Sequence, residues 1–518
     1  MKNINKIILA AFALSFFSCN DDFENPVEDF AVTSGKADFT KYVALGNSLT
    51  SGYMDGALYK TAQENSYPSI LAGLMKPAGG GEFTQPLMPD DIGGFVNFGI
   101  KGKLQLQVVN GSLVPVPTDA QSNFNQLSGA FSNMGVPGAK SFHLGVDGYG
   151  NPAGIATGKA NPYFARFASS ANTSVIKDAV AQQPTFFSLW IGNNDVLSYA
   201  TSGGVGVDRT GNPNAAEYGP NDITDPDLLG NVIESYVKAL TANGTNATKG
   251  VLANIPSVTS VPYFTTVPYA PLSPANASFG PMIPALNQQF GALNMVFDYL
   301  KVPERKIVFS PSSASAVVIK DESLPNLAAE ITAVLTPQVG AQQAALFGLI
   351  YGQARQATAQ DLLVLPSSSY IGKMDTERVE QLKQMGVPAE QAAQLAFAGI
   401  TYPLEDKWVL TRNELQTVEK AVNAYNTKIA EIASKYDLAL VDANTEMRNI
   451  SVSGLTFYGT TYTTSFIAGG AFSLDGVHLT GIGYAIVANM FVKAINQKYS
   501  SNLRQVNPSV YPGVTFPN

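Results

Sequence analysis

Residues 42–50 have the sequence Tyr-Val-Ala-Leu-Gly-Asn-Ser-Leu-Thr, and this stretch decides the predicted fold. Its first four residues form a short apolar run, which is typical of a buried β-strand. Gly46 ends the run and favours a tight turn. Ser48 therefore follows directly after a predicted strand, and loops at strand exits are where binding and catalytic residues concentrate.

Three further apolar runs resemble this strand. Each is short and is followed by a residue that interrupts regular structure; the runs are residues 185–191 before Gly192, residues 251–255 before Pro256, and residues 438–441 before Asp442. We expect these three runs to be buried strands as well.

Helical patterns separate the predicted strands. Asp225 can cap a helix that has Pro226 in its first turn. Thr411 and Glu414 form a capping box at the start of a long amphipathic helix, and Thr480 can cap the last helix. Buried strands that alternate with amphipathic helices predict an α/β fold, with a parallel sheet covered by helices on both faces.

Two long stretches interrupt this alternation. Residues 56 to about 130 are rich in glycine, proline and asparagine, and residues 197 to about 410 combine loops with an Ala/Gln-rich helical region at about 324–400. We interpret both as insertions in one domain at residues 38–500, followed by a C-terminal tail at 501–518. The second insertion is either a cap over a functional site or plain structural packing, and the sequence favours neither.

Four short segments carry residue types with chemical potential. They are residues 46–50, 133–139, 192–195 and 475–480. Three of them lie at the exit of a predicted strand or the entry of a predicted helix, whereas the neighbours of residues 133–139 cannot be assigned. In a parallel α/β sheet, ligands bind beyond the carboxyl ends of the strands, so these segments are candidates for one site.

The residue types in these segments are those that acyl transfer needs. A serine hydroxyl is a weak nucleophile, so Ser48 needs an adjacent base. His478 is the candidate base, because Asp475 lies three residues before it and can orient the ring and stabilise the imidazolium. The backbone N–H groups of Ser48 and Gly138 and the side-chain amide of Asn194 can stabilise negative charge on a substrate oxygen.

In order and content, the four segments resemble the four blocks of the SGNH (GDSL-like) hydrolase family. The resemblance implies that Ser48 is the nucleophile and that Asp475 and His478 complete a catalytic triad. It also implies an oxyanion hole made by Ser48, Gly138 and Asn194. The implied fold is a flavodoxin-like three-layer α/β/α sandwich, and the implied reaction is ester hydrolysis through an acyl-serine intermediate.

Two departures from the family are visible. The family has aspartate before the nucleophile, where this chain has Asn47, and the gaps between the blocks are long. The candidate substrates are lipid esters, acyl or acetyl esters of carbohydrates, and aryl esters. A second hypothesis is a surface binding protein that keeps the fold without using the triad.

The N-terminus resembles the export signal of a bacterial lipoprotein. A positively charged start precedes an apolar stretch at residues 8–17 that is too short to span a bilayer. Cys19, the only cysteine, lies where such a signal is acylated, and acidic residues follow it, similar to the tether of surface-exported lipoproteins in Bacteroidota. We expect a signal peptide at residues 1–19, a membrane anchor on Cys19 and a flexible tether at residues 20–37. This predicts an outer-membrane lipoprotein of the cell envelope; a cleaved signal with an incidental cysteine is the alternative.

The composition excludes several other classes of protein. With 45% hydrophobic and 14% charged residues, the chain can form a large core. Its net charge of −8 argues against the excess of basic residues that nucleic-acid binding needs. One cysteine and two histidines exclude a disulfide framework and a classical zinc site. No phosphate-binding or dinucleotide motif follows a predicted strand, so we expect neither a metal nor a cofactor. His143, the second histidine, has no acidic residue within three positions, and we expect it to be structural.

Overall fold

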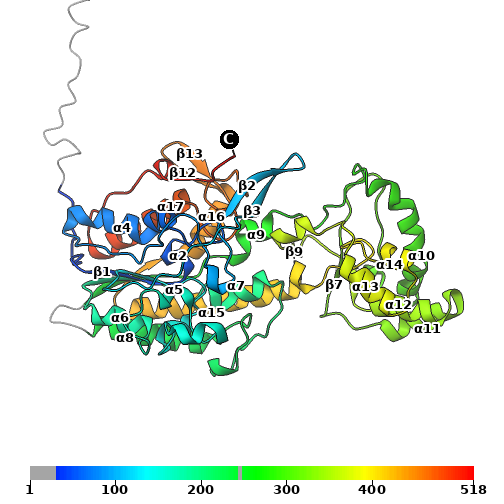
Figure 1. Ribbon diagram of the computed structural model, residues 1–518, viewed down its shortest axis with the longest axis horizontal. Helices are drawn as coiled ribbons and strands as arrows, with labels where there is room; N and C mark the ends of the chain where they lie inside the picture. The colour runs from blue at the N-terminus through cyan, green and yellow to red at the C-terminus, as the bar shows by residue number, and fades with distance from the viewer. Residues whose placement is uncertain (1–30, 243–247, 518) are drawn as a thin grey trace, which may run out of the picture.

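A five-stranded parallel sheet forms the centre of the computed structural model, which describes residues 31–242 and 248–517 (Figure 1). The strands are β1 Tyr42–Gly46, β4 Asn133–Gly135, β5 Phe186–Trp190, β6 Lys249–Ala253 and β11 Ala439–Val441. Four of them confirm the strands predicted from apolar runs. The fifth, β4, coincides with the segment whose neighbours the sequence did not assign.

The order of the strands defines where a ligand is expected. Across the sheet the order is β11-β6-β5-β1-β4, and every neighbouring pair is parallel. Numbered along the chain within the sheet, this is the doubly wound order 2-1-3-4-5, whose direction of winding reverses beside β1. Gly46, the last residue of β1, is in register with both Gly135 and Trp190, so three neighbouring strands end at one level.

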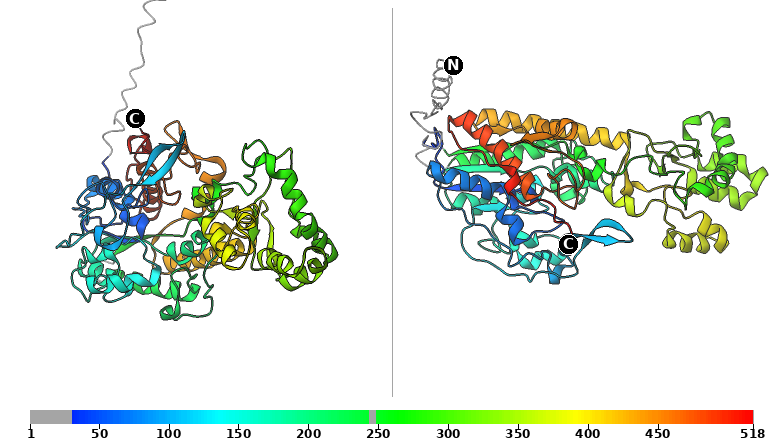
Figure 2. Two further views of the ribbon diagram at one scale, coloured as in Figure 1. Left: turned by 45° about the vertical axis from the view of Figure 1, so that its right-hand side comes forward. Right: turned by 90° about the horizontal axis from the view of Figure 1, so that it is seen from above.

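Helices cover both faces of the sheet, as the alternating pattern predicts (Figures 1 and 2). One face is covered by α4 Tyr67–Met75 and α17 Gly481–Tyr499, which pack against each other. The opposite face is covered by α6 Val175–Ala181, α8 Pro226–Thr241 and α15 Arg412–Lys435. Helix α15 begins with the predicted capping box, and its apolar side chains are buried at helical spacing.

The first predicted insertion is partly wrong. Within residues 56–130, α3 Lys60–Glu64 and α4 follow the nucleophile segment, and α4 is a sheet-covering helix of the core. A two-stranded hairpin, β2 Leu104–Val109 and β3 Ser112–Pro117, projects from the body of the protein (Figure 1). Further along the chain, α5 Pro162–Ala165 is another short helix.

The second predicted insertion is narrower than the expected residues 197–410. Its first part contains α8 and β6, and β6 pairs with β5 inside the central sheet. Residues 194–201 form helix α7, which packs on α15. The true insertion is a second lobe with its own hydrophobic core, whose buried residues run from Val267 to Val409.

The second lobe is mainly helical, which confirms the helical region predicted at about 324–400, and it stands beside the sheet lobe in all views (Figure 2). Its helices are α10 Ile283–Tyr299, α11 Ala328–Val339, α12 Ala341–Tyr351, α13 Thr376–Gln384 and α14 Ala389–Gln394. Two small antiparallel pairs complete it: β7 Val318–Lys320 with β8 Ala354–Gln356, and β9 Leu362–Leu363 with β10 Val409–Leu410.

Both described ends of the chain pack near α17. The Lys36 N–H donates to the Tyr499 carbonyl, so the last residues of the predicted tether are attached to the domain. In the predicted tail, Val506 exchanges hydrogen bonds with the side chain of Asn489. The predicted signal peptide, Cys19 and the start of the tether lie outside the described residues. Among the residues that are described, no helix is long and apolar enough to span a bilayer.

Candidate active site

Ser48 lies at the first position of the short helix α2 Ser48–Ser51, immediately beyond β1. Ser48 is 7% exposed, and its hydroxyl lies 2.8 Å from Nε2 of His478. The turn is tight because helix α2 approaches β4 closely: a Cβ atom on Gly135 would lie 2.3 Å from the backbone nitrogen of Ser51. Glycine at position 135 therefore allows the nucleophile segment to lie against the neighbouring strand.

Asp475 and His478 lie in one turn before α17, as the sequence predicts. Nδ1 of His478 lies 2.9 Å from Oδ2 of Asp475, while Oδ1 of Asp475 accepts the backbone N–H groups of Val477 and His478. Burial acts to raise the pKa of the Asp475 carboxyl, but the charge of His478 and these hydrogen bonds hold the pKa well below its ordinary value. Asp475 is therefore ionised and can orient the imidazole.

Residues 55 and 56, near the other end of the chain, form hydrogen bonds with the turn at residues 473–478. The Gly56 N–H donates to Oδ2 of Asp475 over 2.9 Å. The side chain of Asp55 accepts the Leu474 N–H over 3.0 Å, and the Asp55 N–H donates to the Ser473 hydroxyl over 3.0 Å. These contacts fix the position of the Asp475 carboxylate, and no sequence pattern indicates them because they form only through tertiary structure.

Tyr53 supports the imidazole directly. Its ring centroid lies 4.7 Å from that of His478, and its backbone carbonyl accepts the hydroxyl of Tyr484 over 2.6 Å. Tyr484 belongs to α17, the helix that follows the histidine. The ring of His478 therefore has Asp475 at one edge and an aromatic ring against it, which restricts the imidazole to the orientation that faces Ser48.

The three predicted oxyanion donors come from the exits of three adjacent strands. Within the described residues, the backbone N–H groups of Ser48 and Gly138 donate to no protein acceptor, although Ser48 is buried. Gly138 is exposed, has φ +79° and has open space on its Cβ side. The Asn194 side chain, 9% exposed, donates to the Ala139 carbonyl over 3.0 Å, which leaves its second amide hydrogen available.

A buried network joins the oxyanion segments. Asp195, fully buried, accepts the backbone N–H and the hydroxyl of Ser141 over 2.7 and 2.6 Å. Asn47 accepts the Leu49 N–H and donates its amide to Oδ1 of Asn193 over 3.1 Å. The amide of Asn47 can both accept and donate, so it satisfies both of these contacts.

His143 is not part of the triad and has a structural environment. Nδ1 of its ring accepts the Lys140 N–H over 3.0 Å, and the ring stacks on Tyr149 at 5.0 Å. Burial, together with the charge of Lys140, lowers the pKa of His143 to about 4. The ring is therefore neutral at neutral pH and is already engaged with its own neighbours.

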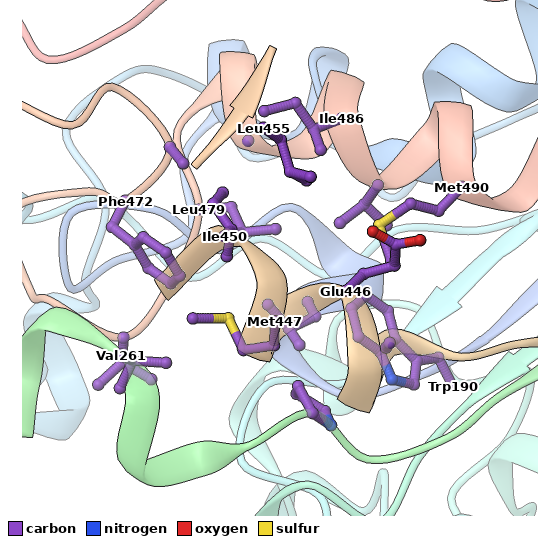
Figure 3. A pocket seen from close by; sticks show the side chains of 17 residues that line it. Trp190, Val261, Glu446, Met447, Ile450, Leu455, Phe472, Leu479, Ile486 and Met490 are labelled. Carbon is purple, nitrogen blue, oxygen red and sulfur yellow. The ribbon is translucent and has the colours of Figure 1, made fainter. Parts of the chain in front are cut away.

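An apolar pocket of about 90 Å³ adjoins the candidate triad (Figure 3). Its walls include Leu49, next to Ser48, and Val477 and Leu479, which flank His478. Figure 3 shows Met447 and Ile450 of helix α16 Ala443–Ser453 facing Ile486 and Met490 of α17 across this space. The strip β12 Leu455–Phe457, paired with β13 Thr460–Tyr462, covers one end.

The segment that leads into the second lobe contacts the turn that contains Asp475 and His478. The Tyr263 N–H, in helix α9 Pro262–Thr265, donates to the Gly476 carbonyl over 2.9 Å. A Cβ atom on Gly476, whose φ is +71°, would lie 3.0 Å from both this nitrogen and the Leu365 side chain. The segments that connect the second lobe to the sheet lobe therefore border the site. The helices of the second lobe, α10–α14, lie away from the sheet (Figure 1).

Comparisons with known proteins give only distant similarity. No protein-family model matches the chain, and no curated protein sequence matches it. Among solved structures, the acetylxylan esterase Axe2 from Geobacillus stearothermophilus has 10% sequence identity and a TM-score of 0.29, covering 89% of this chain and 96% of that chain. A variant of Axe2, an acetyl-xylooligosaccharide esterase, has 11% identity and a TM-score of 0.28 with the same coverage. Similarity this low does not assign an activity to the chain.

Among the described residues, no group of three or more histidine, cysteine or acidic side chains is placed to hold a metal ion. The polar groups at the strand exits instead form a linear chain of hydrogen bonds from a hydroxyl to an imidazole to a carboxylate. Such an arrangement can move a proton away from the hydroxyl and can leave that oxygen as a nucleophile.

Proposed function

We propose that this chain is a serine ester hydrolase of the SGNH (GDSL-like) type, built on a flavodoxin-like three-layer α/β/α sandwich. One observation carries the proposal: the Ser48 hydroxyl, the His478 ring and the Asp475 carboxylate form a continuous hydrogen-bonded chain at the carboxyl ends of the strands. Ser48 and His478 are 430 positions apart in sequence, so their contact is a product of the fold.

The first half of the proposed reaction forms an acyl-serine. Oγ of Ser48 attacks the carbonyl carbon of the ester while Nε2 of His478 takes the hydroxyl proton. The carbonyl oxygen becomes an oxyanion, which the N–H groups of Ser48 and Gly138 and the amide of Asn194 stabilise. When the tetrahedral intermediate collapses, the bond to the alcohol oxygen breaks and His478 returns the proton to that oxygen, so the alcohol leaves neutral.

The second half releases the acid. Water attacks the acyl-serine carbonyl while His478 again removes a proton, and the same donors stabilise the second oxyanion. Collapse of this intermediate breaks the bond to Oγ, and His478 returns the proton to Ser48. Asp475 keeps its negative charge throughout and stabilises the imidazolium that forms twice in each turnover.

A serine-directed fluorophosphonate tests the proposal without knowledge of the substrate. We expect the reagent to label the wild-type chain on Ser48 and to leave Ser48→Ala unlabelled, because only an activated serine reacts at a useful rate. Absence of labelling in the folded wild-type chain would favour the alternative, a surface binding protein that keeps the fold without using the triad. A screen of esters with different acyl lengths, including acetylated glycans, then identifies the substrate class.

Asn194→Ala is expected to lower turnover by about 10²–10³-fold with little change in KM, because one oxyanion donor is lost. The matched control is Asn294→Ala, since the Asn294 amide likewise donates to a backbone carbonyl, that of Ile307 over 2.8 Å, but lies in the second lobe away from the site. Steady-state kinetics of both variants decide the role. If Asn294→Ala loses as much turnover, or if Asn194→Ala changes KM alone, Asn194 is not an oxyanion donor.

We further propose that the protein acts outside the cytoplasm as an outer-membrane lipoprotein anchored through Cys19. The support is the short apolar run that ends at the only cysteine of the chain. Cys19→Ser is expected to shift the protein from the membrane fraction to the soluble fraction of cells, since an acylated chain partitions into bilayers. Fractionation followed by immunodetection measures this, and an unchanged distribution would show that Cys19 is not the attachment point.

A further inference from the structure

The projecting hairpin β2–β3 has an unusual surface for an exposed element. No charged residue occurs between Lys103 and Asp119, and the turn at its tip is Asn110-Gly111. Four large aliphatic side chains next to this turn are exposed: Val108 by 64%, Val109 by 42%, Leu113 by 44% and Val114 by 37%. Neighbouring apolar side chains exposed together are typical of an interaction site, whereas single exposed ones need no explanation.

The pairing of the two strands concentrates this apolar surface. Val108 faces Leu113 and Leu106 faces Pro115 across the ladder, so one face of the hairpin is wholly apolar. The opposite face carries Val109 and Val114 near the tip, with uncharged glutamines towards the base. Figures 1 and 2 show the hairpin projecting from the sheet lobe, and no other described part of the chain covers its tip.

The outer edge of β3 is poor in hydrogen-bond donors. Thr118 N–H donates to the Lys103 carbonyl, and hydrogen-bonded and open pairs alternate along an antiparallel ladder. The nitrogens of Pro115 and Pro117 therefore face outward, where proline has no hydrogen to donate. This lowers the cost of moving the edge out of water, and it also blocks the addition of another strand along β3.

The base of the hairpin is joined to the candidate active site. The Leu104 N–H donates to the Asp55 carbonyl over 2.7 Å, and the next residue, Gly56, donates its N–H to the Asp475 carboxylate. Lys101, exposed, lies just before the hairpin. The element thus has an apolar tip, a base with a cation, and a direct connection to the rim of the catalytic turn.

We propose that the β2–β3 hairpin docks on a lipid surface and inserts its aliphatic tip among the acyl chains. A lipid surface fits better than a second copy of the chain, because the tip is uncharged on both faces and the proline edge disfavours strand pairing. Docking at this point presents the triad to esters held in the lipid layer. The access of the triad to these esters rests on the proposed function, whereas the docking itself does not.

An environment-sensitive label on the tip tests the docking. In the full chain with Cys19→Ser, Ser112→Cys is the only thiol, and Ser112 is exposed beside the turn. A nitrobenzoxadiazole label there is expected to shift its emission to shorter wavelength when phosphatidylcholine vesicles are added, and doxyl groups on the lipid acyl chains are expected to quench it. High salt is expected to leave the shift unchanged, because no charged side chain lies on the hairpin.

The matched control places the same label at Ser313→Cys, an exposed serine of the second lobe. Both labelled chains share the same N-terminus, so membrane attachment through that segment affects both equally, and only the hairpin label is expected to respond. Adding Val108→Asn and Leu113→Asn is expected to lower the apparent affinity for vesicles by about tenfold to hundredfold. Each aliphatic side chain transferred from water into lipid contributes about one order of magnitude to this affinity.

Two results would overturn the proposal. One is a tip label that stays unquenched while the protein is bound to vesicles. The other is an emission shift that grows with protein concentration in the absence of lipid, which would assign the hairpin to contact with a second copy. Fluorophosphonate labelling of the same samples keeps the outcomes separate: an unreactive Ser48 with an inserted tip refutes the proposed activity alone, and the reverse refutes the docking alone.

Discussion

Replacing Ser48 by alanine is expected to lower ester hydrolysis by about 10⁶-fold while the protein stays folded, as for loss of the serine in comparable triads. Among the described residues, the Ser48 hydroxyl forms a hydrogen bond only with Nε2 of His478, so the substitution removes one part-buried hydrogen bond. The remaining donors of the oxyanion site stay in place, so a small residual rate above that of water is expected.

Ser51→Ala is the matched control, because Ser51 belongs to the same short helix and its buried hydroxyl donates, within the described part of the chain, only to the Ser48 carbonyl, over 2.9 Å. We expect this variant to keep its rate within about tenfold, since a single neutral hydrogen bond contributes about 1 kcal/mol. Initial rates on one ester and near-ultraviolet circular dichroism measure activity and folding. Hydrolysis by folded Ser48→Ala at the wild-type rate would remove Ser48 from the mechanism.

The two histidines are expected to respond in opposite ways to substitution. His478→Ala should lower the rate by about as much as loss of the nucleophile, because the members of a triad act as a unit. His143→Ala should keep most of the activity, because His143 contacts Lys140 and Tyr149 and not the triad. Removing the buried ring of His143 lowers the stability of the protein. The His143→Ala variant is therefore assayed well below its melting temperature.

The pH dependence gives a second, independent measurement. A general base acts only when it is unprotonated, so the rate is expected to rise with pH as the base loses its proton. Asp475 cannot set this limb, because its pKa is held below the ordinary value and it is already ionised there. His143 cannot set it either, because its pKa is lowered to about 4 and the ring is neutral above that pH. Activity that survives His478→Ala and disappears with His143→Ala would reverse the assignment.

Local patterns in the sequence predicted the elements that have a continuous apolar run or a clear capping signal. The apolar runs of β1 and β5 are uninterrupted, and the capping box at Thr411 places the start of α15. Strand β4 was not assigned because it has three residues and begins with Asn133, which the sheet buries. Pairing with β1 determines this strand, and pairing leaves no periodic pattern in so short a segment.

The candidate triad was predictable because its residue types are rare or closely spaced. The chain has two histidines, and an aspartate precedes one of them by three positions. The contact between Gly56 and Asp475 was not predictable, because a backbone N–H carries no sequence signal and joins residues 419 positions apart. The Asn110-Gly111 turn is a known signal for a two-residue hairpin, and it identifies β2–β3 when the flanking apolar residues are considered with it.

The closure of the catalytic turn by residues from both ends of the chain also determines when the nucleophile becomes reactive during biosynthesis. A ribosome adds about 5–20 residues per second, so the 430 positions between Ser48 and His478 correspond to roughly 20–90 s of synthesis. Throughout that interval the nascent polypeptide has its serine but not its base. Under the proposed mechanism, a chain that ends before position 478 is inert for the same reason, and hydrolysis is expected only after His478 has been added and its turn has folded.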